Sequence, residues 1–193
     1  MVAKLDSRPR HFEGLDVLVF ERVLVAPSFH SFIYICLLHT GRSCVEGVEY
    51  EDVFITYNGT EPTNASDLLA DGYILTGNES RSERFQYAER LYNDVKNKYP
   101  DKNIHLTGHS LGGQEAAYVG CKNKVASVTT FNRGSNPLAT DVNNKNCTSN
   151  VTNYKTRNDP ISTGPYALPN QKLIVLQGSG GFDPHGMSNF NVV

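Results

Sequence analysis

The stretch Gly108-His109-Ser110-Leu111-Gly112-Gly113 lies between a short apolar run, residues 104–107, and a helical pattern, residues 114–119. A strand, a sharp turn and a helix are the context in which G-x-S-x-G forms a nucleophile elbow. Such a turn strains the serine backbone and exposes its hydroxyl. Gly108 and Gly112 have no Cβ, so strand and helix can approach closely around the serine. The first helical N–H groups then face the reacting carbon, where they stabilise a developing oxyanion. The stretch therefore predicts Ser110 as a catalytic nucleophile rather than one residue of a glycine-rich turn.

The rest of the chain alternates between strand and helix patterns. Strands are predicted at residues 31–39, 52–57, 104–107, 125–131, 151–155 and 172–176. The clearest helix spans 80–99, where Ser80 and Glu83 fit a capping box and one face is apolar. The helix after Ser110 is expected to end at Gly120. Residues 15–26 fit either a helix or a hairpin. This alternation predicts a mostly parallel sheet with helices on both faces, and residues 1–193 as a single α/β domain.

Composition excludes several classes of protein. With 193 residues, of which 39% are hydrophobic, the chain is long enough for one domain with a sizeable core. A net charge of -2 provides no basic field for nucleic acid or an anionic membrane. The first ten residues are charged and lack the apolar core of a signal peptide, and no apolar stretch is long enough to span a membrane. We expect a cytoplasmic location by default, and secretion stays open because of five glycosylation sequons. These begin at Asn58, Asn64, Asn78, Asn146 and Asn150.

The four cysteines follow no metal-ligand spacing. They would permit three disulfide pairings, but in a core of this size we expect free buried thiols. They are Cys36, Cys44, Cys121 and Cys147.

A serine nucleophile needs a base, and functional groups in a doubly wound sheet come from loops at the carboxyl ends of strands. His185 meets this requirement because it follows the last predicted strand directly. The other five histidines fit less well. Two precede the relevant strands, one lies at the end of an early strand and one lies within the strand before Ser110. The fifth is next to Ser110 in the chain, and its side chain is expected to point away from the serine. They are His11, His30, His39, His105 and His109.

The base in turn needs an orienting acid between Ser110 and His185. Asp159 follows the strand at 151–155, and Pro160 would fix the turn that presents it. Asp141 also lies in this interval, inside a polar loop with no strand end nearby, and Asp183 suits a turn cap better. We therefore predict Asp159 as the acid and keep Asp141 as the alternative.

Two groups are expected to hold the oxyanion. One is the N–H of Leu111, directly after the nucleophile. The other is Thr60, which follows the strand at 52–57 and offers both an N–H and a hydroxyl, while Gly59 lets the backbone approach the substrate. The alternative is that Asn58-Gly59 makes a hairpin turn.

These residues resemble the class 3 lipase family and its bacterial lipase-like and phospholipase-like relatives, which have the α/β-hydrolase fold. The resemblance covers residues 52–190. It rests on the GHSLGG string with the amphipathic helix before it and on five further segments: Tyr57-Asn-Gly-Thr60, Asp71, Val128-Thr-Thr-Phe131 with the proline-containing loop after it, Asn158-Asp159-Pro160 and His185-Gly-Met-Ser-Asn-Phe190. It implies that Ser110, Asp159 and His185 form the triad and that Thr60 and Leu111 form the oxyanion hole.

The chain departs from this family in three places. Asn58 stands where an arginine is usual, and the tryptophan usual ahead of the acidic residue is absent. The candidate lid, residues 61–80, is polar and carries Glu61, Asp67, Asp71 and Glu79. A polar lid argues against activation on bulk triglyceride.

The reaction implied is hydrolysis of a lipid or small carboxylic ester through an acyl-enzyme. It requires no metal and no organic cofactor, and it would permit transient contact with a lipid surface. A thioesterase, acyltransferase or amidase would use the same residues. A non-catalytic hydrolase scaffold that binds a partner is the alternative from another class, since fold does not imply function.

Overall fold

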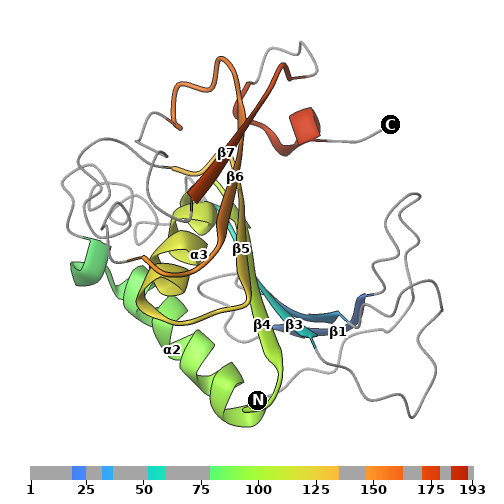
Figure 1. Cartoon of the computed structure of the whole chain (residues 1–193), viewed down its shortest axis with the longest axis vertical. Helices are drawn as coiled ribbons and strands as arrows, with labels where there is room; N and C mark the ends of the chain where they lie inside the picture. The colour runs from blue at the N-terminus through green and yellow to red at the C-terminus, as the bar shows by residue number, and fades with distance from the viewer. Residues whose placement is uncertain are drawn as a thin grey trace.

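The computed structural model describes residues 19–24, 32–36, 52–59, 79–134, 147–162, 171–178 and 184–190. Seven strands form one sheet in chain order: β1 (Val19–Leu24), β2 (Phe32–Cys36), β3 (Asp52–Tyr57), β4 (Asn103–His109), β5 (Ser127–Phe131), β6 (Val151–Thr156) and β7 (Gln171–Leu176). The pairs β1–β2 and β2–β3 are antiparallel, and every pair from β3 to β7 is parallel (Figure 1). The carboxyl ends of five strands therefore lie along one edge, which is where a doubly wound sheet gathers functional groups.

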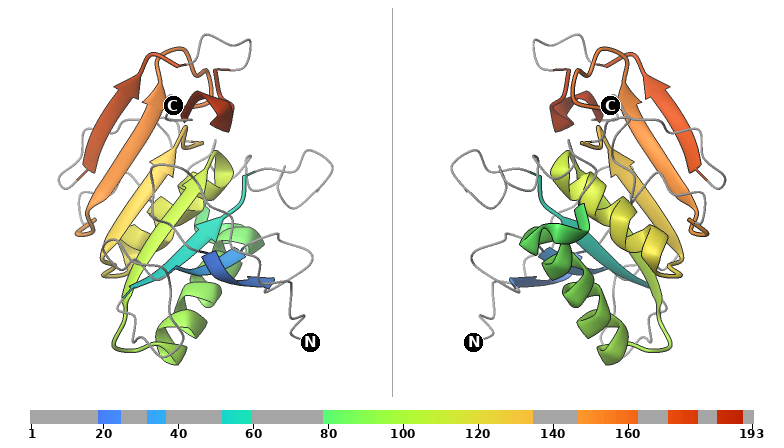
Figure 2. Two further views of the ribbon diagram at one scale, coloured as in Figure 1. Left: turned by 90° about the vertical axis from the view of Figure 1, so that its right-hand side faces the viewer. Right: turned by 90° about the vertical axis from the view of Figure 1, so that its left-hand side faces the viewer.

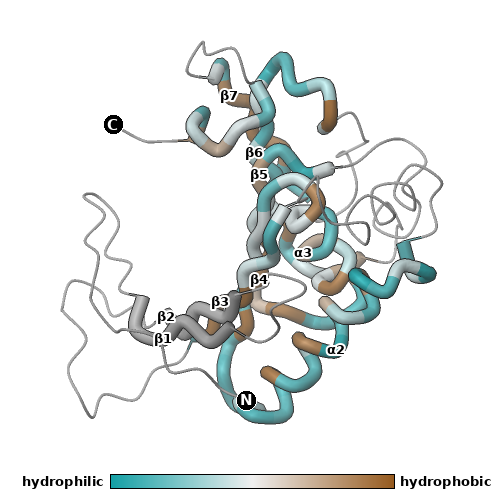
Figure 3. The backbone as a smooth tube through the Cα atoms, turned by 180° about the vertical axis from the view of Figure 1, so that it is seen from behind, coloured by the Kyte–Doolittle hydropathy of each residue, from teal (hydrophilic) through white to brown (hydrophobic). Residues whose placement is uncertain are grey.

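Two helices cover one face of the sheet, α2 (Glu83–Lys98) and α3 (Leu111–Lys122) (Figure 2). The sheet presents buried side chains to them from alternate positions, as in Val53 and Ile55 of β3 and Ile104 and Leu106 of β4. The apolar residues of α2 recur at helical spacing and are buried, so hydrophobic and hydrophilic stretches alternate along its tube in Figure 3. The core thus lies between the parallel strands and these two helices.

The opposite face of the sheet has a different cover. The short 3-10 helix η2 (Met187–Phe190) packs there, with the Phe190 ring 5.1 Å from that of Phe131 at the end of β5. Within the described ranges both α-helices therefore lie on one face, and η2 is the helical element on the other. This contact brings the C-terminal segment to the carboxyl edge of the sheet.

Three details of the predicted secondary structure were wrong or left open. The capping box at Ser80 does not form: a 3-10 turn, η1 (Glu79–Arg81), precedes α2, and Ser82 is its N-cap residue, without a side-chain capping bond. Gly120 lies inside α3, where a Cβ would come within 2.3 Å of Val128 Cγ2, so this glycine allows close packing on β5 and does not end the helix. For the segment 15–26 a helix or a hairpin was left open: its described residues, 19–24, form the single strand β1, which pairs with β2, so they are not helical.

The expectation of free thiols is wrong for two cysteines. Cys121 in the last turn of α3 and Cys147 just before β6 form a disulfide, with Cα atoms 4.4 Å apart. Packing of α3 beside the sheet brings together residues that are 26 positions apart in the chain. In the part of the chain that the structure describes, no helix is long and apolar enough to cross a membrane.

Candidate active site

Ser110 lies at the junction of β4 and α3 in a strained conformation, with φ 55° and ψ -125°. Left-handed φ values are unfavourable for residues with a Cβ, so the surrounding contacts must impose this one. The Ser110 N–H donates to the Phe131 carbonyl at 3.1 Å. Its own carbonyl accepts from the N–H groups of Gln114 at 3.2 Å and Gly134 at 2.9 Å. The strained turn is present, and these three bonds hold it to β5, to α3 and to the segment that follows β5.

Two glycines of the motif permit the close approach that the sequence predicted. A Cβ on Gly108 would lie 2.3 Å from the Gly112 carbonyl carbon and oxygen. A Cβ on Gly112 would lie 2.1 Å from the Tyr57 carbonyl oxygen and 2.5 Å from that of Asn58. The obstacles are backbone atoms, so no side-chain rotation could relieve them. The first turn of α3 therefore packs directly on the end of β3.

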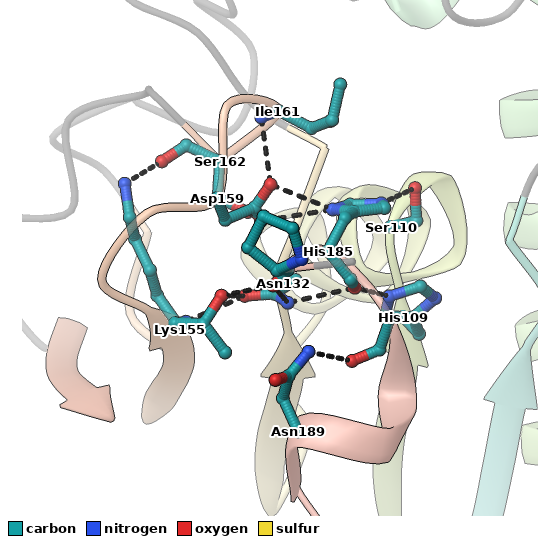
Figure 4. A network of polar contacts seen from close by, with 12 residues as sticks. His109, Ser110, Asn132, Lys155, Asp159, Ile161, Ser162, His185 and Asn189 are labelled. Carbon is teal, nitrogen blue, oxygen red and sulfur yellow. Dashed lines mark hydrogen bonds and ion pairs between the residues drawn. The ribbon is translucent and has the colours of Figure 1, made fainter. Parts of the chain in front are cut away.

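The side chains of Ser110, His185 and Asp159 are in contact at the carboxyl edge of the sheet (Figure 4). His185 Nε2 lies 2.8 Å from Ser110 Oγ. His185 Nδ1 lies 3.0 Å from both carboxylate oxygens of Asp159. With the proton on Nδ1, the imidazole donates to the carboxylate and Nε2 accepts from the serine hydroxyl, so the three side chains form a continuous hydrogen-bonded chain.

The Asp159 carboxylate is buried and has two further donors besides His185. The Ile161 N–H donates at 2.9 Å and the Ser162 hydroxyl donates to the other oxygen. Burial raises the pKa of this carboxyl, but the hydrogen bonds from His185, Ser162 and Ile161 outweigh burial, and the net pKa lies below its ordinary value. The group is therefore ionised at neutral pH, with its oxygens aimed at the imidazole.

Asn132, which the sequence did not single out, holds the segment that carries His185. It is fully buried, has a φ of 41°, and lies just after β5. Its side-chain amide donates to the carbonyls of Pro184 at 3.0 Å and His185 at 2.9 Å, and its Oδ1 accepts from the Thr156 N–H at 2.8 Å. One amide thus joins the ends of β5 and β6 to the histidine segment. Asparagine tolerates left-handed φ better than most residues, and this preference is the only sequence signal that could have identified the position.

His109 also contacts the histidine segment. Its Nε2–H donates to the His185 carbonyl at 2.7 Å, and the two imidazole rings lie 4.8 Å apart. The ring next to the nucleophile in the chain therefore contacts His185. The His185 carbonyl accepts two hydrogen bonds, one from Asn132 and one from His109.

The expected oxyanion donors are described in part. Leu111 is the first residue of α3, so its N–H is among those that have no partner within the helix. Gly59 lies against the elbow, since a Cβ placed on it would come 3.4 Å from Ser110 Cβ. Other predicted positions, namely Thr60, Asp71, the lid up to residue 78, Asp141, Asp183, His11, His30 and His39, lie outside the described residues.

The parallel sheet, the helices and the strained serine between β4 and α3 make this an α/β-hydrolase fold, as the sequence predicted. Among the described residues no group of three or more His, Cys, Asp or Glu side chains is placed to hold a metal ion.

Comparison with known proteins gives distant likenesses only. No family model matches the chain, and no curated protein matches it. The match to a triacylglycerol lipase from Penicillium expansum covers 82% of this chain and 66% of the lipase, at 14% identity and a TM-score of 0.42. The match to a mutant form of MDLA from Penicillium cyclopium covers 76% of this chain and 57% of that protein, at 14% identity and a TM-score of 0.41. The match to a lipase from Rhizopus microsporus var. chinensis covers 69% of this chain and 52% of that lipase, at 18% identity and a TM-score of 0.35. The chain thus spans between half and two thirds of the length of these proteins.

Proposed function

We propose that the protein is a serine hydrolase of carboxylic esters that acts through an acyl-enzyme. The observation that carries this proposal is the contact chain from Ser110 Oγ through the His185 imidazole to the buried Asp159 carboxylate. His185 takes the proton of Ser110 as the oxygen attacks the ester carbonyl. It then protonates the leaving alcohol and, in the second half of the reaction, activates water to release the acid. The ionised Asp159 holds the imidazole and stabilises its protonated form.

The oxyanion hole is proposed to consist of the Leu111 N–H and Thr60. Support comes from Leu111, which begins α3 next to the nucleophile, and from Gly59, which packs against Ser110. Donors fixed where negative charge develops are worth about two to three orders of magnitude in rate each. No step of this reaction draws on a metal or an organic cofactor.

A fluorophosphonate probe tests the proposal directly, because it labels only an activated serine. We expect one adduct, on Ser110, and loss of both labelling and hydrolysis of a short-chain p-nitrophenyl ester in Ser110→Ala. Ser127→Ala is a matched control. Ser127 Oγ also contacts an imidazole, His105 Nδ1 at 2.8 Å, whose Nε2 lies 3.1 Å from Asp52. Ser127, however, begins β5 and does not precede a helix, so the control should keep full activity.

The outcomes of this experiment separate the enzyme from a scaffold. Folded wild-type protein that neither labels nor hydrolyses any ester would favour a non-catalytic hydrolase fold that binds a partner. Full activity in Ser110→Ala would overturn the assignment of the nucleophile.

The acid is tested by a pair of substitutions. Asp159→Asn should leave the fold intact and lower kcat by about four orders of magnitude, because the amide stabilises the wrong imidazole tautomer. Asp141→Asn should change kcat little. The reverse pattern would move the role of the acid to Asp141.

We further propose soluble or dispersed esters, monoacylglycerols or lysophospholipids as substrates rather than bulk triglyceride. The support is the polar composition of residues 61–80, whose two short apolar patches are flanked by acidic side chains. Each buried apolar side chain would contribute only about 1.5–3 kcal/mol to contact with a lipid surface. The rate should therefore rise smoothly as substrate passes its solubility limit. A sharp increase when an emulsion appears would indicate a triglyceride lipase.

A further inference from the structure

A buried arginine lies between the two helices and the loop that follows β3. Arg84, in the first turn of α2, is 2% exposed. Its Nε donates to Glu115 Oε1 in α3 at 2.8 Å. Its Nη2 donates to the Asn58 carbonyl at 2.5 Å and lies 3.4 Å from the Gly59 carbonyl. A single planar guanidinium therefore joins α2, α3 and the loop after β3.

This loop runs directly past the nucleophile. The Asn58 carbonyl lies under the first turn of α3, where a Cβ on Gly112 would come within 2.5 Å of it. Gly59 contacts the elbow on the other side, because a Cβ there would meet the His109 carbonyl oxygen at 3.3 Å and Ser110 Cβ at 3.4 Å. A shift of the loop would therefore change the distance between the N-terminus of α3 and the peptide groups that follow β3.

The cost of burying two charges argues for a role beyond general stability. An ion pair withdrawn from water recovers its desolvation penalty only with good geometry and further hydrogen bonds, and an apolar pair of similar size is often as stable. Glu115 is 1% exposed and stands in a helix whose neighbouring positions, Ala116 and Ala117, are apolar and buried. While Nε bonds Glu115, Nη2 of the same guanidinium faces two consecutive carbonyls of one loop, a planar geometry that a lysine cannot reproduce.

We propose that Arg84, fixed by Glu115, is a positioning residue that holds the Asn58–Gly59 loop at its working distance from the N-terminus of α3, and so sets the geometry of the oxyanion hole. This inference rests on the proposed ester hydrolase function. The Gly59 carbonyl and the N–H that follows it belong to one planar peptide group. A hydrogen bond to the carbonyl therefore also restrains the direction in which that N–H points. The contacts of Arg84 described above are with Glu115 and with the loop, so it would act on the transition state through the loop.

The experiment compares Arg84→Met and Arg84→Lys with the matched control Arg90→Met. Arg90 lies on the same helix, is exposed, and contacts the Tyr87 ring. Steady-state hydrolysis is measured per active site, with the site concentration taken from fluorophosphonate titration, so that misfolded protein does not count. A trifluoromethyl ketone is used as a second probe, because its serine adduct places a negative oxygen in the oxyanion hole.

We expect both Arg84 variants to lose roughly tenfold or more in kcat, since the loss of a complete oxyanion donor costs about 10²–10³. KM and the acid limb of the pH profile should stay near wild type, because the substitution leaves the His185–Asp159 pair in place and acts on the oxyanion of the transition state. Affinity for the trifluoromethyl ketone should fall by the same factor as kcat/KM. Arg90→Met should match wild type in all three measurements.

Other results would overturn the inference. If the Arg84 variants melt at lower temperature but keep wild-type kcat per titrated site, the arginine is merely structural. If Arg84→Met does not fold, Glu115→Gln serves as the second variant: it keeps a hydrogen-bond acceptor but removes the charge, and it should lower kcat without raising KM. Wild-type protein that shows no hydrolysis and no labelling would instead reject the proposed function.

Discussion

Replacement of Asn132 by glycine removes the amide that holds the histidine segment and keeps the left-handed φ of 41° accessible. The Thr156 N–H loses its partner at 2.8 Å, and an unsatisfied buried donor costs about 1–3 kcal/mol. The Pro184 and His185 carbonyls each lose one of two donors, since the Thr156 hydroxyl and His109 remain. Those two losses are smaller, about 0.5–1 kcal/mol each. The total is about 3 kcal/mol of unfolding free energy.

For a chain of this length, about 3 kcal/mol corresponds to a decrease in Tm of roughly 6–12 °C, measurable by circular dichroism. We also expect kcat to fall about tenfold or more, because His185 would be held less firmly against Ser110 and small misplacements of a catalytic group are costly. Asn132→Ala makes the comparison sharper: it loses the same bonds and adds the left-handed strain of a Cβ, about 1–2 kcal/mol more. Wild-type Tm and kcat in Asn132→Gly would refute this account of the residue, and equal Tm values for the two variants would refute the strain argument.

Three further results are expected. The pKa of Asp159 is lower in the folded than in the unfolded chain. This group therefore stabilises the fold above its unfolded pKa, and the contribution is lost as pH falls through the folded pKa. In melting curves recorded between pH 2 and 6, the Tm values of wild type and Asp159→Asn should converge at the acid end. The disulfide between Cys121 and Cys147 joins residues 26 positions apart, so its reduction should lower stability by about 3.5 kcal/mol on the chain-entropy estimate. This should appear as a lower Tm in reductant, and the double serine variant should reproduce it without reductant. Gly112→Ala would place a Cβ 2.1 Å from the Tyr57 carbonyl oxygen, so we expect little soluble protein or a displaced α3 with no fluorophosphonate labelling; wild-type yield and labelling would contradict this packing.

Local patterns were sufficient for much of the fold. The strand at 52–57 was predicted with its observed bounds, and the glycine pattern around Ser110 predicted the strained turn between strand and helix. These features depend on side-chain alternation and on the absence of a Cβ, which are properties of neighbouring residues. The chain order of Ser110, Asp159 and His185 was likewise readable, because loops after parallel strands meet at one edge of the sheet.

Errors arose where a residue's state depends on a distant segment. Cys121 looks like a free thiol until α3 packs next to the segment before β6 and brings Cys147 beside it. Gly120 looks like a helix end, but β5 lies so close to α3 that any larger residue would collide with Val128.

By itself, the sequence determined the alternation of strands and helices, the strained turn at Ser110, and the chain order of Ser110, Asp159 and His185. Tertiary structure alone decided which polar residues hold the candidate site together. Arg84 and Glu115 carry no local signal of such a role, because charged residues on a helix are ordinary surface features. Asn132 carries only a weak one, the tolerance of asparagine for a left-handed φ. These residues become buried, and find the carbonyls they bind, only when strands and helices far apart in the chain pack against each other.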